Sequence, residues 1–258
     1  MGILARILMF PSAEAKMRAF SFIEEQAKKG QAEEYDTVRL YNKEYGLDIT
    51  IKLLFKVSVQ STLSSSDISN IYKVEVDVPV EHKSLEGEFR VKEVREAWLV
   101  YLKPSQGEHP AVERMAVMAT EYSSSTIRYA LQALRKLGFV AVESFIELPR
   151  GAKAIDVLKE LGNIGWVFIG DIHDMHLRGA SLYGVRLQDS EVLEDLTTRG
   201  GRIKATIIEH PARGVKIIIS ERGTIYSQKY VDTASLARMI KEIASVLFKH
   251  NLVRLRTG

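Results

Sequence analysis

ISNIYKVEVDVPV, residues 68–80, alternates apolar side chains with polar ones. In an extended chain, Tyr72 and the valines that follow it fall on one side, and the charged side chains between them fall on the other. This period of two is typical of a β-strand that buries one face and exposes the other. The stretch therefore predicts a sheet with one apolar face.

The surrounding sequence, from residue 37 to residue 103, continues in the same way. It contains further segments rich in β-branched and aromatic residues, namely TVRLYN, LDITIKLLFKVSV, EFRV and AWLVYL. Turn-forming residues such as Tyr45-Gly46 and Glu86-Gly87 separate these segments. Because the connections are short, we expect an antiparallel meander.

Helices are predicted on both sides of this meander. Residues 12–29 have apolar side chains at helical spacing, with Ser12 as N-cap and Gly30 as a stop. Two more helices are expected after the meander, one beginning at Pro110 and continuing to about residue 119, and one over residues 126–137.

The second half of the chain predicts another mixture of strands and helices. FVAVESFIEL, IGWVFIGDIH, ASLYGVRL, RIKATIIEH, VKIIIS and TIYSQKY are expected strands. Short helices are expected over 152–161 and 190–196, and Asp232 caps a longer amphipathic one. We therefore predict an α+β fold of mainly antiparallel sheet packed against amphipathic helices. Two α+β units, 1–138 and 139–258, are the expected division, with a single continuous domain as the alternative.

The composition limits the function classes. The chain has 258 residues, 46% of them apolar, and no cysteine. Disulfides, thiolate metal sites and a cysteine nucleophile are therefore excluded. The N-terminal apolar stretch is short and contains Arg6, so it does not resemble a signal peptide, and we expect a soluble cytoplasmic protein that needs no cofactor. The composition is also compatible with a thermophilic source.

The charge is unevenly distributed. Residues 199–258 carry 12 Lys and Arg but only 4 Asp and Glu, whereas the rest of the chain is net acidic. Such a basic end predicts an anionic partner, for which nucleic acid or a nucleoprotein particle is our expectation. The alternative is that the basic end pairs with the protein's own acidic part. The expected nucleic-acid contacts are Arg199, Arg202, Lys204, Arg213, Lys216, Arg222, Tyr226 and Lys229.

The segment GDIHDMH, residues 170–176, contains two of the six histidines and two aspartates. The longer run VFIGDIHDM resembles the first motif of metal-dependent phosphoesterases of the calcineurin-like family. That resemblance implies a two-metal centre with Asp171 and His173 as ligands. His210 is a candidate third ligand, although the later histidine motifs of that family are missing from this chain. A hydrogen-bonded strand end is the alternative reading.

The segment MATEYSSSTIRYALQALRKLGFV, residues 118–140, resembles the helix-turn-helix of winged-helix regulators. The resemblance implies that Ser124, Thr126 and Arg128 face the major groove. A helical hairpin that packs on the first sheet is the alternative.

No phosphate-binding loop, dinucleotide fingerprint, nucleophile elbow or HExxH motif is present. We therefore expect a non-enzymatic protein that binds nucleic acid or a nucleoprotein particle through its basic C-terminal unit. Two alternatives stay open: a metal-dependent phosphoesterase or nuclease centred on Asp171 and His173, and an assembly protein that forms homo-oligomers.

Overall fold

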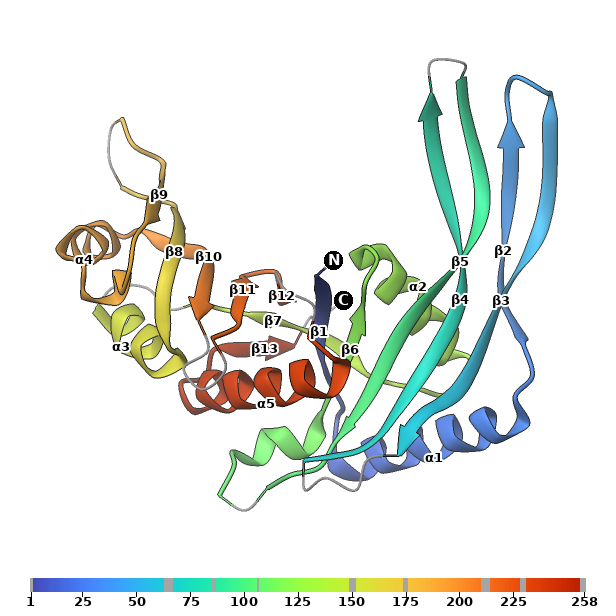
Figure 1. Cartoon of the computed structure of the whole chain (residues 1–258), viewed down its shortest axis with the longest axis horizontal. Coiled ribbons are helices and arrows are strands. Elements are labelled where there is room, and N and C mark those ends of the chain that lie inside the picture. The colour runs from blue at the N-terminus through green and yellow to red at the C-terminus, as the bar shows by residue number, and fades with distance from the viewer. Residues whose placement is uncertain are drawn as a thin grey trace.

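The computed structural model has an α+β fold in which one antiparallel sheet runs through the whole molecule (Figure 1). The structure describes residues 2–62, 67–84, 87–105, 107–148, 152–173, 176–209, 214–227 and 231–255. Along the sheet the strands follow in the order β2-β3-β4-β5-β6-β1-β12-β11-β10-β8-β9, while β7 pairs with β1 and with β13. The predicted fold class is confirmed.

The predicted meander forms one end of this sheet. It consists of β2 (Glu33–Asn42), β3 (Leu47–Thr62), β4 (Ile68–Ser84) and β5 (Gly87–Leu102). The last residues of β2 pair with β5, Tyr41 with Arg90 and Asn42 with Phe89, so the four strands close into a small barrel. The two long hairpins β2–β3 and β4–β5 rise together as an arm on the right of Figure 1.

The region after the meander corrects one of our predictions. Instead of a helix up to residue 119, a short 3-10 helix (Pro110–Arg114) leads into strand β6 (Met115–Thr120). Only the second predicted helix forms, as α2 (Ser124–Arg135). The helix-turn-helix reading is therefore wrong, since its first helix is a strand and the side chain of Thr126 is fully buried.

The first residues of the chain, which gave no strand signal, form β1 (Ile3–Met9) in the middle of the sheet. This strand pairs with β6 on one side and with β12 (Thr224–Ser227) on the other, and its last residues pair with β7 (Val142–Ile146). Strands from both predicted units, 1–138 and 139–258, thus share one sheet.

The other end of the sheet contains β11 (Lys216–Ser220), β10 (Arg202–Glu209), β8 (Asn163–Gly170) and β9 (Gly179–Tyr183). The remaining elements are α1 (Ala13–Lys29), α3 (Ala152–Leu161), a 3-10 turn (Leu187–Asp189), α4 (Glu191–Thr198), α5 (Thr233–Lys249) and β13 (Val253–Leu255). The predicted caps are confirmed: Ser12 and Asp232 accept the N–H groups of Ala15 and Ser235. No helix in the described ranges is long and apolar enough to cross a membrane.

Two cores lie on opposite faces of the sheet. In β6, Val117 and Ala119 belong to the core beneath α5, whereas Ala116 and Met118 belong to the core beneath α1 and α2. The α1–α2 core extends toward β3 and β4, and the α5 core extends toward β8 and β10. Among the described elements, helices therefore cover both faces only in the middle of the sheet.

Asp77 lies where β3 and β4 separate at the base of the arm. The β3–β4 ladder ends at the pair Phe55–Val76, so the next N–H of β3, that of Leu54, has no strand partner in β4. The buried Asp77 carboxylate accepts this N–H at 2.8 Å and pairs with the Lys92 ammonium at 3.0 Å. One side chain thus satisfies the backbone at the point of divergence.

We predict that Asp77→Ala lowers the free energy of unfolding by about 1–3 kcal/mol, because it leaves the Leu54 N–H and the Lys92 ammonium without their shared acceptor. Urea denaturation measures this change. Asp48→Ala is the matched control, since Asp48 forms an exposed ion pair with Arg39 and its loss should leave the free energy of unfolding nearly unchanged. Equal losses in the two variants would contradict this role of Asp77.

Lys16 on α1 is a buried lysine, only 2% exposed. Its ammonium donates to the carbonyl oxygens of Leu102 at 2.6 Å and Glu113 at 3.0 Å, and lies 4.7 Å from the centre of the Tyr101 ring. Burial, assisted by repulsion from Lys241, lowers the pKa of Lys16 to about 7. The folded chain therefore binds fewer protons than the unfolded chain above pH 7.

Because the unfolded state binds the extra proton, stability should rise with pH. We predict that the shifted pKa of Lys16 makes the free energy of unfolding about 2 kcal/mol higher at pH 9 than at pH 7. Denaturant titrations at the two pH values should show this increase in the parent and in Lys29→Met, an exposed lysine on the same helix. In Lys16→Met the increase should disappear, and its persistence there would contradict the assignment.

Candidate nucleic-acid interface

One face of the sheet end formed by β12, β11, β10, β8 and β9 is covered by helices, whereas no helix of the described residues covers the other. Alternate side chains such as Val167, Ile203 and Ile219 point into the α5 core, to which α3 and α4 also contribute. The side chains between them point away from these helices. We call this second surface, on the described residues of the five strands and the adjoining part of β1, the open face.

A row of directly paired side chains crosses the open face. Each member is the cross-strand partner of the next, from β9 to β6. The row is Tyr183, Trp166, Ile207, Ile218, Tyr226, Leu4 and Thr120. At the usual strand spacing it is about 29 Å long.

Aromatic rings gather at the β9 end of this row. Tyr183 is 77% exposed, and its ring centre lies 6.2 Å from that of Trp166. Phe168, also exposed, lies on the same face two residues further along β8. Beside Trp166 and Tyr183 is a pocket of about 290 Å³, whose rim includes Arg186, Glu209 and Lys216. The face therefore offers flat apolar rings next to charged groups.

Several of the predicted nucleic-acid contacts lie on the open face. Tyr226 belongs to the row, Lys216 is exposed at the pocket, and Arg222 is exposed in the turn between β11 and β12. Arg202 and Lys204 lie together at the far end of β10. Sequence reasoning missed Trp166, Phe168 and Tyr183, although their alternation in neighbouring strands was a usable signal.

Ion pairs within the protein engage some of these cations. Lys204 contacts Asp171 at 2.7 Å and Glu221 at 3.3 Å, and Arg202 lies 3.5 Å from the same Glu221 carboxylate. Arg199 lies off the face, where it pairs with Asp195 of α4 at 3.0 Å. Arg213 and Lys229 lie outside the described residues. The basic end is thus partly neutralised by its own carboxylates.

Of the predicted metal ligands, the structure describes Asp171 and His173. Strand β8 ends at Gly170, and Asp171 has a left-handed backbone (φ 56°), so the chain turns before His173. The His173 ring lies against Gly200, and the backbone N–H of His173 donates to the Arg199 carbonyl. No three acidic or histidine side chains among the described residues form a metal-binding group, and His210 lies outside those residues. A metal site here stays a prediction.

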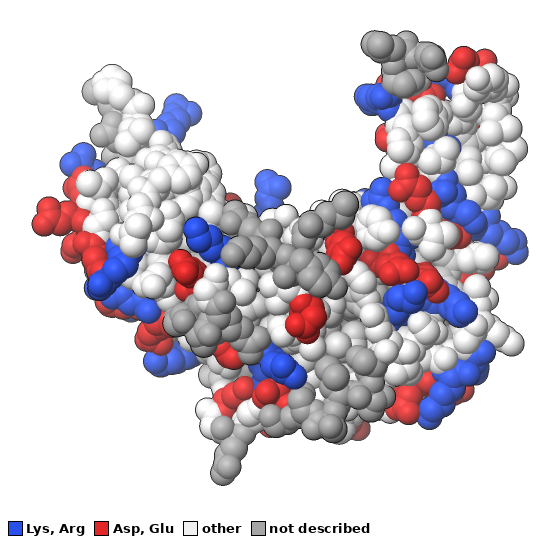
Figure 2. Space-filling model, viewed as in Figure 1, with Lys and Arg blue, Asp and Glu red and all other residues white. Residues whose placement is uncertain are grey.

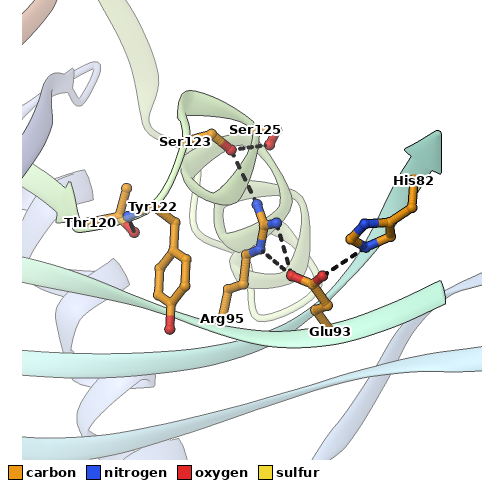
Figure 3. A network of polar contacts seen from close by, with 7 residues as sticks. All are labelled: His82, Glu93, Arg95, Thr120, Tyr122, Ser123 and Ser125. Carbon is orange, nitrogen blue, oxygen red and sulfur yellow. Dashed lines mark hydrogen bonds and ion pairs between the residues drawn. The ribbon is translucent and has the colours of Figure 1, made fainter. Parts of the chain in front are cut away.

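A polar network borders the other end of the row (Figure 3). Arg95 donates two hydrogen bonds to Glu93, at 2.9 and 3.1 Å, and a third to Ser123 at the start of α2. These bonds, with a further one from His82, lower the pKa of the Glu93 carboxyl. Within the network His82 contacts Glu93 and not a serine, so no nucleophile–base pair is formed. The network instead fixes α2 to β5.

Figure 2 shows a hollow between two raised parts of the molecule, the arm of β2–β5 and the end that carries β8 and β9. Much of the visible surface of the β8–β9 end is uncharged (Figure 2).

Comparison with protein-family models, curated proteins and solved structures finds no match to this chain. What the open face binds must therefore be inferred from the chemistry of its own residues.

Proposed function

We propose that this protein is a non-enzymatic binder of single-stranded nucleic acid, free or within a nucleoprotein particle, and that the strand lies across the open face. The observation that carries the proposal is the pair of neighbouring aromatic rings, Tyr183 and Trp166, at the exposed end of the cross-strand row. Aromatic rings on an antiparallel sheet can stack on unpaired bases of any sequence.

The arrangement of the charges supports the same proposal. Lys216 lies on one side of the row, and Arg202, Lys204 and Arg222 lie on the other, so phosphates have cations on both sides of the stacked bases. Because Lys204 and Arg202 already have carboxylate partners, phosphate must compete with these carboxylates. Stacking should therefore contribute more to affinity than charge does.

We predict that Tyr183→Ala and Phe168→Ala each weaken binding about 5- to 100-fold, the loss of one base-stacking contact. Anisotropy of a labelled single-stranded oligonucleotide, as DNA and as RNA, measures the affinity. Tyr45→Ala is the matched control, because Tyr45 in the β2–β3 turn is also 77% exposed and lies far from the row. Equal effects of Tyr45→Ala and Tyr183→Ala, or no binding by the parent protein, would refute the proposal.

A second prediction concerns salt. With two to four phosphate contacts, the logarithm of the binding constant should fall with the logarithm of salt concentration at a slope of about −2. Lys216→Glu should lower the affinity and make the slope shallower by about 0.7. Lys56→Glu, a charge reversal at an exposed position of β3, should change neither quantity. If Lys216→Glu leaves the salt dependence of the binding constant unchanged, the phosphates do not contact Lys216, and this part of the proposal is wrong.

A further inference from the structure

The two ends of the sheet differ in a way that bears on assembly. At one end the pairing of β2 with β5 closes the barrel. At the other end β9 pairs only with β8 among the described residues, so its outer side is an edge of the sheet. Unpaired N–H and C=O groups on such an edge are ready to pair with another strand.

Apart from its short length, strand β9 lacks the features that usually prevent edge pairing. Its sequence, Gly179-Ala-Ser-Leu-Tyr183, contains no charged residue and no proline, and it pairs with β8 without a bulge. Exposed apolar side chains follow and precede it: Val185 is 90% exposed and Leu177 is also exposed. Protected edges carry lysine, proline or bulges at such positions.

The hydrogen-bond pattern shows which groups point outward. Just beyond β9, the N–H of Gly184 donates to the carbonyl of Gly165 in the strand-pair register. Bonded and non-bonded pairs alternate along an antiparallel ladder, so Leu182 and Ala180 also bond to β8. The backbone groups of Gly179, Ser181 and Tyr183 therefore point to the outer edge.

We propose that β9 pairs antiparallel with β9 of a second copy of this chain, about a two-fold axis at Ser181. This register uses all three outward-pointing residues. It sets Tyr183 opposite the partner's Gly179 at each end of the paired strands. An aromatic ring beside a glycine is a favourable cross-strand pair, and no charged residues of β9 oppose each other.

The pairing has a consequence for the open face. Directly opposed residues of an antiparallel pair lie on the same side of a sheet, and Tyr183 and Gly179 share the open face in each copy. The open faces of the two copies would therefore join into one surface. The dimer itself depends only on the β9 edge and does not rest on nucleic-acid binding. Because β9 is short, the interface is small and dimerisation should depend on concentration.

Sedimentation velocity across a concentration series tests the proposal without any nucleic acid. The parent protein should show a monomer–dimer equilibrium. Ser181→Lys and Ser181→Glu should each be monomeric, because each sets two like charges face to face at the axis. An equal mixture of the two variants should recover the dimer, which an unfolded variant could not do.

Thr50→Lys is the matched control, since Thr50 is an exposed strand residue on β3 at the far end of the sheet, and it should dimerise as the parent does. A parent protein that is monomeric at every concentration would overturn the proposal. So would a Ser181→Lys variant that dimerises normally, or a mixture of the Lys and Glu variants that stays monomeric.

Discussion

The burial of β1 and β6 on both faces is the constraint on which the rest of the structure depends. β6 is buried along its whole length, and β1 is buried at every residue except Leu4 and Arg6. A strand covered on both faces must pair on both edges and must carry apolar or small side chains on each side. These two strands therefore join the meander to the C-terminal strands, and they separate the α1–α2 core from the α5 core.

The open face follows from how the helices are divided between the two sides of the sheet. α1 and α2 cover one side at the meander end, whereas α3, α4 and α5 cover the opposite side at the other end. Within the part of the chain that the structure describes, the open face of β8–β12 therefore has no helix cover. The aromatic and aliphatic side chains on that face leave apolar area in contact with water, which is unfavourable. Exposed apolar patches of this kind commonly mark binding sites. The placement of the helices thus explains why the candidate site lies on the open face.

Much of the fold could be predicted from local sequence, and the exceptions have a common physical reason. The alternation of residues 68–80 and the caps at Ser12 and Asp232 identified strands and helices correctly, because these elements have one solvent-exposed side and one buried side. β6 is buried on both sides, and β1 is buried on both sides except at Leu4 and Arg6, so neither strand shows a sustained alternation of apolar and polar side chains. A short apolar run such as Met115–Thr120 fits a helix as well as a strand. Only the pairing partners, which are distant in sequence, decide between the two.

The difference between local sequence patterns and contacts between distant residues also explains what could be predicted of the site. Arg202 and Lys204 were recognisable as basic residues of one strand. Their shared carboxylate partner Glu221 comes from the turn between β11 and β12, and the second partner of Lys204, Asp171, comes directly after β8. Cross-strand register brings these groups together, and composition does not report it. The charge excess of residues 199–258 consequently overstates how basic the open face is. If a nucleic acid binds this face, as we propose, it must gain affinity from the rings of Trp166 and Tyr183 as well as from charge. Stacking on these rings would favour unpaired bases over a duplex whose bases are already stacked.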